Sequence, residues 1–171
     1  LAPGFTPFDP NRYDTYSYSI HPNVVTSLEF ERILSASGPY EGHLARPSDH
    51  KEPQKIAWLQ CVGSRDEEHP YCSRICCGHA VKNALKLKEI NPQANVYVLY
   101  RDVRTYGFYE TYYHEARGKG VVFIRYDLDN KPDVVLRDGG LQVSLHDPAL
   151  GSRVTLAADW VVLSTGVEPH D

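Results

Sequence analysis

The fold is decided by residues 56–90, IAWLQCVGSRDEEHPYCSRICCGHAVKNALKLKEI. An apolar run from Ile56 to Cys61 predicts a buried strand, and a polar loop follows it. Apolar residues then recur at helical spacing from about Ser73 to Ile90. Asn91-Pro92 predicts the end of this helix, because proline disfavours a helical conformation in the residue before it. A turn between a strand and a helix often holds cofactor phosphates. Here it carries cysteines instead.

The alternation of strands and helices continues after this stretch. We predict strands at 96–100 and 121–126, with a helix over about 108–117 between them. Three short runs separated by turn residues then predict an antiparallel meander, at 133–137, 141–146 and 153–156. A buried strand at 160–164 closes the pattern. The sequence therefore predicts an α/β protein with a Rossmann-like three-layer unit, a β-α-β-α-β order followed by a meander and a closing strand.

The pattern divides the chain into two parts. Residues 1–55 are interrupted by seven prolines and predict an irregular crossover segment. One short helix is expected there, capped by Thr26 or Ser27 and ended at Gly38-Pro39. Residues 56–171 are predicted to form the Rossmann-like domain with the four-cysteine turn.

Length and composition exclude several classes of protein. The 171 residues carry a formal net charge of −4, which gives no indication of a nucleic-acid surface. No apolar run approaches the roughly 18 residues that span a bilayer, so no direct membrane insertion is expected. No secretory signal is recognised, and we expect a cytoplasmic protein. The start at Leu1, without methionine, and the interior-like end predict a piece of a longer chain.

All four cysteines fall within 17 residues, at Cys61, Cys72, Cys76 and Cys77. Clustering of this kind, without a secretory signal, favours a metal or redox site over structural disulfides. A [4Fe-4S] cluster needs four thiolates that converge on one cube. Cys72 and Cys76 would share one helix face, whereas Cys77 would point about 100° away from Cys76 on a regular helix. We expect Cys77 to join only if the backbone departs from helix there.

Other roles for these cysteines stay open. A structural zinc or docking module could use Cys61, Cys72 and Cys76 with either Cys77 or His79. A thiol–disulfide centre could use Cys72 and Cys76.

A pyridine-nucleotide site (NAD(P) or FAD) is a further alternative. The phosphate turn of such a site needs glycines, and none occurs between Gly63 and Gly78, where Glu67 and Glu68 would repel a pyrophosphate. Arg65 and Arg74 would offset the charge of a cluster, or would pair with Asp66 or Glu67 at the surface.

Two resemblances sharpen these expectations. The strand order and the closing Ser164-Thr165-Gly166 resemble the pyridine-nucleotide domain of two-dinucleotide flavoproteins such as thioredoxin reductase. Four motifs are similar to the A-subunit of heterodisulfide reductase and to the A-subunit of the quinone-interacting membrane-bound oxidoreductase. They are NVVTSLEFER at 23–32, QCVGSRD at 60–66, YCSRICC at 71–77 and YRDVRTYG at 100–107.

The second resemblance implies an iron–sulfur flavoprotein of anaerobic metabolism that transfers electrons. It implies that the four cysteines, Cys61, Cys72, Cys76 and Cys77, are the ligands of a [4Fe-4S] cluster. Because the domains that would shield this cluster are missing from the piece, we expect it to be lost when the protein is prepared in air. The resemblance also implies FAD in the full-length protein but not in this piece, which alone would be inactive. The expected partners are other heterodisulfide reductase-type iron–sulfur subunits, with hydrogenase or dehydrogenase subunits as further candidates.

Overall fold

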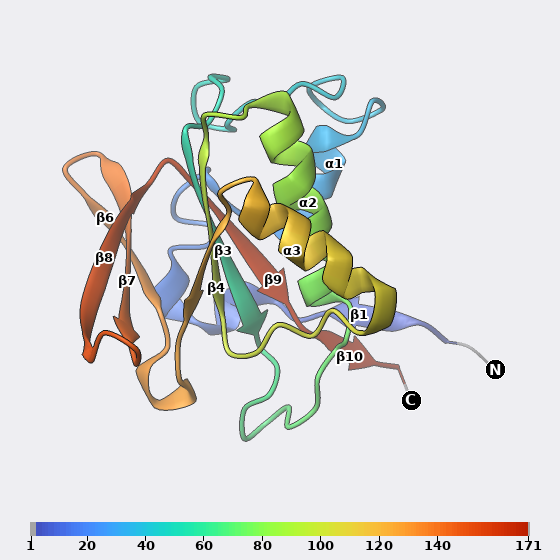
Figure 1. The fold of residues 1–171 in the computed structure, drawn as a ribbon, viewed down its shortest axis with the longest axis vertical. Helices are drawn as coiled ribbons and strands as arrows, with labels where there is room; N and C mark the ends of the chain where they lie inside the picture. Colours follow the sequence, from blue (N-terminus) through green and yellow to red (C-terminus); the bar gives the residue numbers. More distant parts are fainter. Residues whose placement is uncertain (1–2, 171) are drawn as a thin grey trace.

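A five-stranded parallel sheet lies at the centre of the structure, a computed structural model that describes residues 3–170 (Figure 1). Its strand order is β2-β9-β3-β4-β5, and every neighbouring pair is parallel. The strands are β2 (Val24–Thr26), β3 (Lys55–Val62), β4 (Asn95–Tyr100), β5 (Val122–Arg125) and β9 (Trp160–Thr165). The central strands read as continuous apolar runs because both faces of the sheet are covered.

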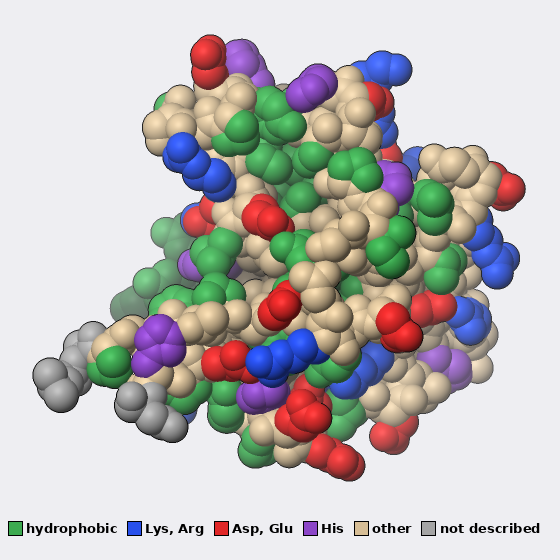
Figure 2. Space-filling model, turned by 180° about the vertical axis from the view of Figure 1, so that it is seen from behind, with side chains coloured by type: hydrophobic (Ala, Val, Ile, Leu, Met, Phe, Trp, Pro, Cys, Tyr) green, Lys and Arg blue, Asp and Glu red, His purple; other side chains and the backbone are tan. Residues whose placement is uncertain are grey.

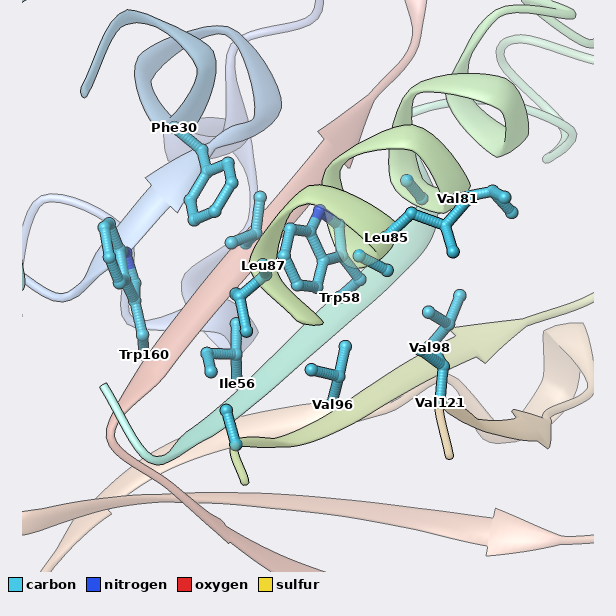
Figure 3. Close-up of a cluster of buried hydrophobic side chains, with 14 of the residues drawn as sticks. Phe30, Ile56, Trp58, Val81, Leu85, Leu87, Val96, Val98, Val121 and Trp160 are labelled. Carbon is cyan, nitrogen blue, oxygen red and sulfur yellow. The ribbon is translucent and has the colours of Figure 1, made fainter. Parts of the chain in front are cut away.

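Three helices cover one face of this sheet: α1 (Ser27–Leu34), α2 (Cys76–Ile90) and α3 (Glu110–Gly118). Their apolar sides meet the sheet in a core built around Trp58 and Trp160 (Figure 3). The Phe30 ring of α1 lies 5.0 Å, between centroids, from each of these two indole rings. Aromatic contacts of this kind add to the stabilisation from apolar burial alone.

The opposite face of the sheet is covered by an antiparallel meander, which forms the third layer (Figure 1). It consists of β6 (Asp133–Arg137), β7 (Gly140–Asp147) and β8 (Ser152–Ala158). Leu141, Val143 and Leu145 alternate along β7 and are buried against the sheet. The predicted Rossmann-like three-layer unit is confirmed.

The first 55 residues contribute more than the single helix that we expected. β2 pairs with β9 as an edge strand of the central sheet, with Val25 opposite Val162. A capping box between Thr26 and Glu29 starts α1 directly after β2. Val25 and Phe30 lie in the same core as Trp58. The segment before residue 55 and the Rossmann-like part therefore share one hydrophobic core.

A second small sheet joins the two ends of the described chain. β1 (Phe5–Pro7) pairs antiparallel with β10 (Val167–Pro169). Four 3-10 turns complete the structure, at η1 (Pro10–Arg12), η2 (Asp14–Tyr16), η3 (Gly107–Tyr109) and η4 (Leu128–Asn130).

Two helices begin later than the sequence predicted. α2 begins at Cys76 rather than at Ser73, because Arg74 has a left-handed backbone conformation with φ of 64°. α3 begins at Glu110, after the 3-10 turn η3.

The surface is mixed in character. On the face that Figure 2 shows, acidic and basic side chains are interspersed with apolar ones rather than gathered by sign. Within residues 3–170, no helix combines the length and hydropathy needed to cross a bilayer.

Candidate functional site

The carboxyl ends of β9, β3 and β4 lie side by side and form the base of the candidate site. Parallel sheets present their functional side chains at this edge. Cys61 belongs to the central strand of the three, β3, one residue before its end. Its φ is 62°, and the pairing of β3 with β9 shifts register between Leu59 and Val62. An L-residue rarely adopts this conformation, which in folded proteins concentrates at functional sites.

Cys76 and Cys77 occupy the first two positions of α2, and their thiols face the two strands that flank β3. Cys76 Sγ lies 3.5 Å from the carbonyl oxygen of Thr165, the last residue of β9. Cys77 Sγ lies 3.6 Å from the carbonyl oxygen of Asp102, just beyond β4. Both residues belong to α2, so Cys77 reaches the edge of the sheet without the departure from helix that we expected.

Cys72 lies in the loop before α2, and its Sγ accepts a hydrogen bond of 3.4 Å from the backbone N–H of Arg74. Its charge influences the pKa of both Cys76 and Cys77. All four cysteines are free thiols and partly exposed. The structure therefore brings the four predicted residues to one place, from a strand end, a loop and a helix start.

The loop between β3 and α2 is held in shape by several hydrogen bonds. The Arg65 N–H donates to the carbonyl of Tyr71 at 3.1 Å, which closes the loop on itself. Asp66 accepts hydrogen bonds from the Tyr13 hydroxyl at 3.0 Å and from the backbone N–H of His69 at 2.8 Å. His69 Nε2 lies 3.2 Å from a carboxylate oxygen of Glu168. These contacts fix the segment that carries Cys72.

Two glycines allow the backbones at this edge to approach closely. Gly63 has φ of 67°, and a Cβ atom there would lie 2.1 Å from the ring of Phe8. At Gly166, a Cβ atom would lie 2.7 Å from the carbonyl oxygen of Gly63. Both contacts are too short for any side chain. The exits of β3 and β9 are therefore packed backbone to backbone beside Cys61 and Cys76.

Burial favours the neutral form of three of the four thiols. Burial raises the pKa of Cys61, Cys76 and Cys77. For Cys76, burial together with the charges of Cys61, Cys77 and Cys72 raises the pKa to about 12. Four thiolates could share this site only with a cationic group that offsets their charge.

Arginine side chains surround the thiols. The guanidinium of Arg65 is within hydrogen-bonding reach of Cys61, where it counteracts the effect of burial on the Cys61 pKa. Arg101 also lowers the Cys61 pKa, and Arg104 lowers that of Cys77. Arg74 contributes its backbone N–H to Cys72, while its side chain lines a groove between α2 and α3.

Arg101, Asp102 and Arg104 also lie at the site, although no motif in the sequence favoured them. A signal was available, since these residues directly follow the strand next to β3, and the ends of parallel neighbours meet at one edge. Asp102 carries an ion pair with Arg65, with Nη2 and Oδ2 2.6 Å apart. His79, considered as a zinc ligand, instead has its Nδ1 3.7 Å from Glu31.

The arrangement fits a multi-iron cluster in its donor set. No three His, Cys, Asp or Glu side chains within residues 3–170 are grouped as ligands of a metal ion. The other three thiols are nevertheless close enough to raise the pKa of Cys76, and Nη1 of Arg65 is buried at this edge without a hydrogen-bond partner in the described part of the chain. A buried guanidinium N–H beside thiols suits an anionic sulfur ligand.

Comparison with solved structures defines the class of fold. L-lysine 6-monooxygenase from Pseudomonas syringae is similar with a TM-score of 0.59 and 15% identity, over 99% of this chain and 45% of that one. Thioredoxin reductase from Lactococcus lactis is similar with a TM-score of 0.54 and 12% identity, over 99% and 44%. The chain therefore has the Rossmann-like fold of two-dinucleotide flavoproteins, with a cysteine turn in place of the glycine-rich one.

Sequence relatives narrow this class, although no protein-family model matches. The chain is 43% identical, over 98% of its length, to the A-subunit of H(2)/formate:CoB-CoM heterodisulfide,ferredoxin reductase of Methanococcus maripaludis. It is also 43% identical, over 99%, to the iron-sulfur A-subunit of CoB--CoM heterodisulfide reductase of Methanocaldococcus jannaschii. The chain belongs to the A-subunit family of heterodisulfide reductases, and it spans 26% of the length of each of these two relatives.

Proposed function

We propose that this chain is the electron-transfer part of an iron–sulfur flavoprotein oxidoreductase, and that Cys61, Cys72, Cys76 and Cys77 ligate a [4Fe-4S] cluster. The observation that carries the proposal is the convergence of all four cysteines on one edge of the sheet. Three elements supply them: β3, the loop after it and the start of α2. Thiolates are the ligands that hold such clusters, and the cluster supplies one-electron transfer when it is bound.

The surrounding residues have distinct roles in this proposal. Arg65, Arg101 and Arg104 offset the negative charge of thiolate ligands and thereby favour the reduced form of the site. The open N–H groups at the start of α2 act in the same direction, because its N-terminus has no side-chain cap. Ser73 Oγ accepts a 3.0 Å hydrogen bond from the N–H of Val167, which keeps the cysteine loop closed over the exit of β9.

The names of the relatives support the same role. The Methanocaldococcus jannaschii protein is named an iron-sulfur subunit, and the Methanosarcina mazei relative is named as part of a Ferredoxin:CoB-CoM heterodisulfide reductase. We propose that FAD lies in the remaining parts of the protein, that other iron–sulfur subunits are its partners, and that it acts in the cytoplasm. We also propose that the full-length protein acts on the same substrates as the other members of this family.

The other roles considered for the cysteines are less well supported. A thiol–disulfide centre needs an activated thiolate, whereas burial raises the pKa of Cys76 to about 12. A zinc site would require the thiols to move around one ion, with zinc–sulfur distances of about 2.3 Å. His79, the alternative fourth ligand, lies beside Glu31 instead. A pyrophosphate would have to replace the thiols of Cys76 and Cys77 at the start of α2.

The proposal is tested by anaerobic reconstitution with iron and sulfide, followed by counting of both and EPR spectroscopy of the reduced sample. We expect about four irons and four sulfides per chain and a low-temperature signal from a reduced cluster. Cys76→Ser should lose most of this signal. His79→Ala should retain it, and serves as a matched control on the same helix turn.

A colourless, iron-free wild-type chain after reconstitution would refute the cluster. Stoichiometric zinc that resists replacement by iron would favour the structural module. A full signal in Cys76→Ser would show that iron binds elsewhere.

A further inference from the structure

Asp102 contacts two arginine side chains and one cysteine thiol at the candidate site. Its Oδ2 lies 2.6 Å from Nη2 of Arg65 and 3.7 Å from Nη2 of Arg104. Its backbone carbonyl faces Cys77 Sγ at 3.6 Å. Asp102 thus contacts residues from both arms of the cysteine turn, although it comes from the neighbouring strand exit.

Arg65 needs such an anchor. Its backbone has a left-handed conformation with φ of 60°, and its side chain is only 16% exposed. Its guanidinium is within hydrogen-bonding reach of Cys61, and its Nη1 is buried without a hydrogen-bond partner among residues 3–170. Arg101 Nη1 donates to the carbonyl of Arg65 and fixes the backbone. Asp102 is the side-chain anion that fixes the guanidinium.

We propose that Asp102 is a positioning residue, which holds the Arg65 guanidinium against Cys61 and so favours the reduced form of the metal centre. This inference rests on the proposed cluster. Asp102 acts through Arg65, since its carboxylate by itself would disfavour an added electron. If Asp102 contributed only its own negative charge, it would favour the oxidised form of the centre instead.

The two possible roles give opposite signs for one substitution. Asp102→Asn removes a negative charge, and by charge alone it would shift the oxidised–reduced equilibrium of the centre toward the reduced form. If Asp102 positions Arg65, the substitution releases the guanidinium and the shift is toward the oxidised form. We expect a change of about tenfold in the equilibrium, as for the loss of one charge-assisted hydrogen bond.

The first measurement is an anaerobic EPR-monitored redox titration of the reconstituted 171-residue chain and its variants. Arg65→Gln and Asp102→Asn should both shift the equilibrium toward the oxidised form, while Asp102→Glu should restore the wild-type value. In Arg65→Gln, adding Asp102→Asn should shift the equilibrium back toward the reduced form, because only the charge of Asp102 is then removed. Asp127→Asn is the matched control, since Asp127 pairs with Arg125 at 3.5 Å and is similarly exposed.

A second measurement needs no metal. In the iron-free chain, NMR detects whether the guanidinium protons of Arg65 are protected from exchange with water. Wild type and Asp102→Glu should show protection, and Asp102→Asn should lose it. If the wild-type chain binds no iron, the proposed function fails, and this NMR comparison still decides the role of Asp102. Unchanged protection in Asp102→Asn, or a shift toward the reduced form, would overturn the inference.

Discussion

The thiol of Cys76 lies 3.5 Å from the carbonyl oxygen of Thr165, and this contact joins the first residue of α2 to the last residue of β9. In a dinucleotide-binding domain this space between helix start and strand ends accommodates a pyrophosphate. Here the partly exposed thiols of Cys76 and Cys77 occupy it, each hydrogen-bonded to a backbone carbonyl. Because the Cys76 thiol is held in its neutral form, it should react slowly with alkylating reagents.

Alkylation of Cys76 in the metal-free chain should be slow. Burial and the neighbouring thiols raise its pKa from 9.0 to about 12, so the thiolate fraction at pH 8 is about a thousandfold lower than for an ordinary cysteine. A more basic thiolate is more nucleophilic, which reduces the expected deficit in rate to about 30-fold. Iodoacetamide labelling followed by mass spectrometry measures this rate, with the chain in urea as the control. Equal rates in the folded and unfolded chain would contradict the structure.

Gly63→Ala should destabilise the chain strongly. The added Cβ meets the ring of Phe8 at 2.1 Å, and the φ of 67° is unfavourable for alanine. We expect a loss of about 3 kcal/mol in the free energy of unfolding, measured by urea denaturation. Gly78→Ala is the control, because nothing lies within 4 Å of its Cβ position in α2. That variant should be slightly more stable, by about 0.5 kcal/mol. A neutral Gly63→Ala would disprove the close packing of Gly63 against Phe8.

Asp66 should make the stability depend on acid pH. Burial alone would raise its pKa, but hydrogen bonds from His69 N–H and the Tyr13 hydroxyl lower the pKa overall. A carboxyl with a lowered folded pKa stabilises the fold above its unfolded pKa of about 3.9, and this stabilisation is lost as pH falls through the folded value. Wild type should exceed Asp66→Asn in free energy of unfolding by about 1 kcal/mol at pH 7. This difference should begin to shrink below about pH 4 and should be lost as pH falls through the lowered folded pKa.

The control for this prediction is Glu67→Gln, because Glu67 is an exposed side chain of the same loop. Urea denaturation of all three chains between pH 3 and pH 7 provides the comparison. A difference between wild type and Asp66→Asn that stays the same from pH 7 to pH 3 would show that the carboxylate charge is not what stabilises the loop.

NADH and NADPH should bind only weakly to this chain. The phosphate position at the start of α2 is occupied by Cys76 and Cys77, and the turn before it offers a single glycine at Gly63. We expect no saturation up to about 1 mM in equilibrium dialysis, the affinity range of non-specific contacts. Submillimolar binding that is lost in Arg101→Gln would instead support a pyridine-nucleotide domain.

Much of the fold could be predicted from local pattern. The strands from β3 to β9 and the two helices between them each have a clear period or apolar run, and all were predicted to within a few residues. β2 was missed because it has only three residues and is recognisable only through its pairing with β9, which lies 137 positions later. The late start of α2 was missed because the left-handed backbone of Arg74 has no sequence signal.

The candidate site was predictable in its thiols but not in its surroundings. Four clustered cysteines are visible in the sequence, whereas the role of Asp102 depends on which strand lies next to β3. That neighbour is β4, as the sheet order shows. The expectation for the Arg74 side chain stays a prediction, since in the structure only its backbone N–H reaches a cysteine.

Whether the four cysteines hold one cluster is decided by a crystal structure of the anaerobically reconstituted chain, with diffraction data at the iron edge. We predict one anomalous peak of about four irons at the carboxyl edge of β3, in contact with the sulfur atoms of Cys61, Cys72, Cys76 and Cys77. An iron-free site with all four thiols unligated, or a peak that leaves any of these cysteines uncoordinated, would contradict the proposed ligand set.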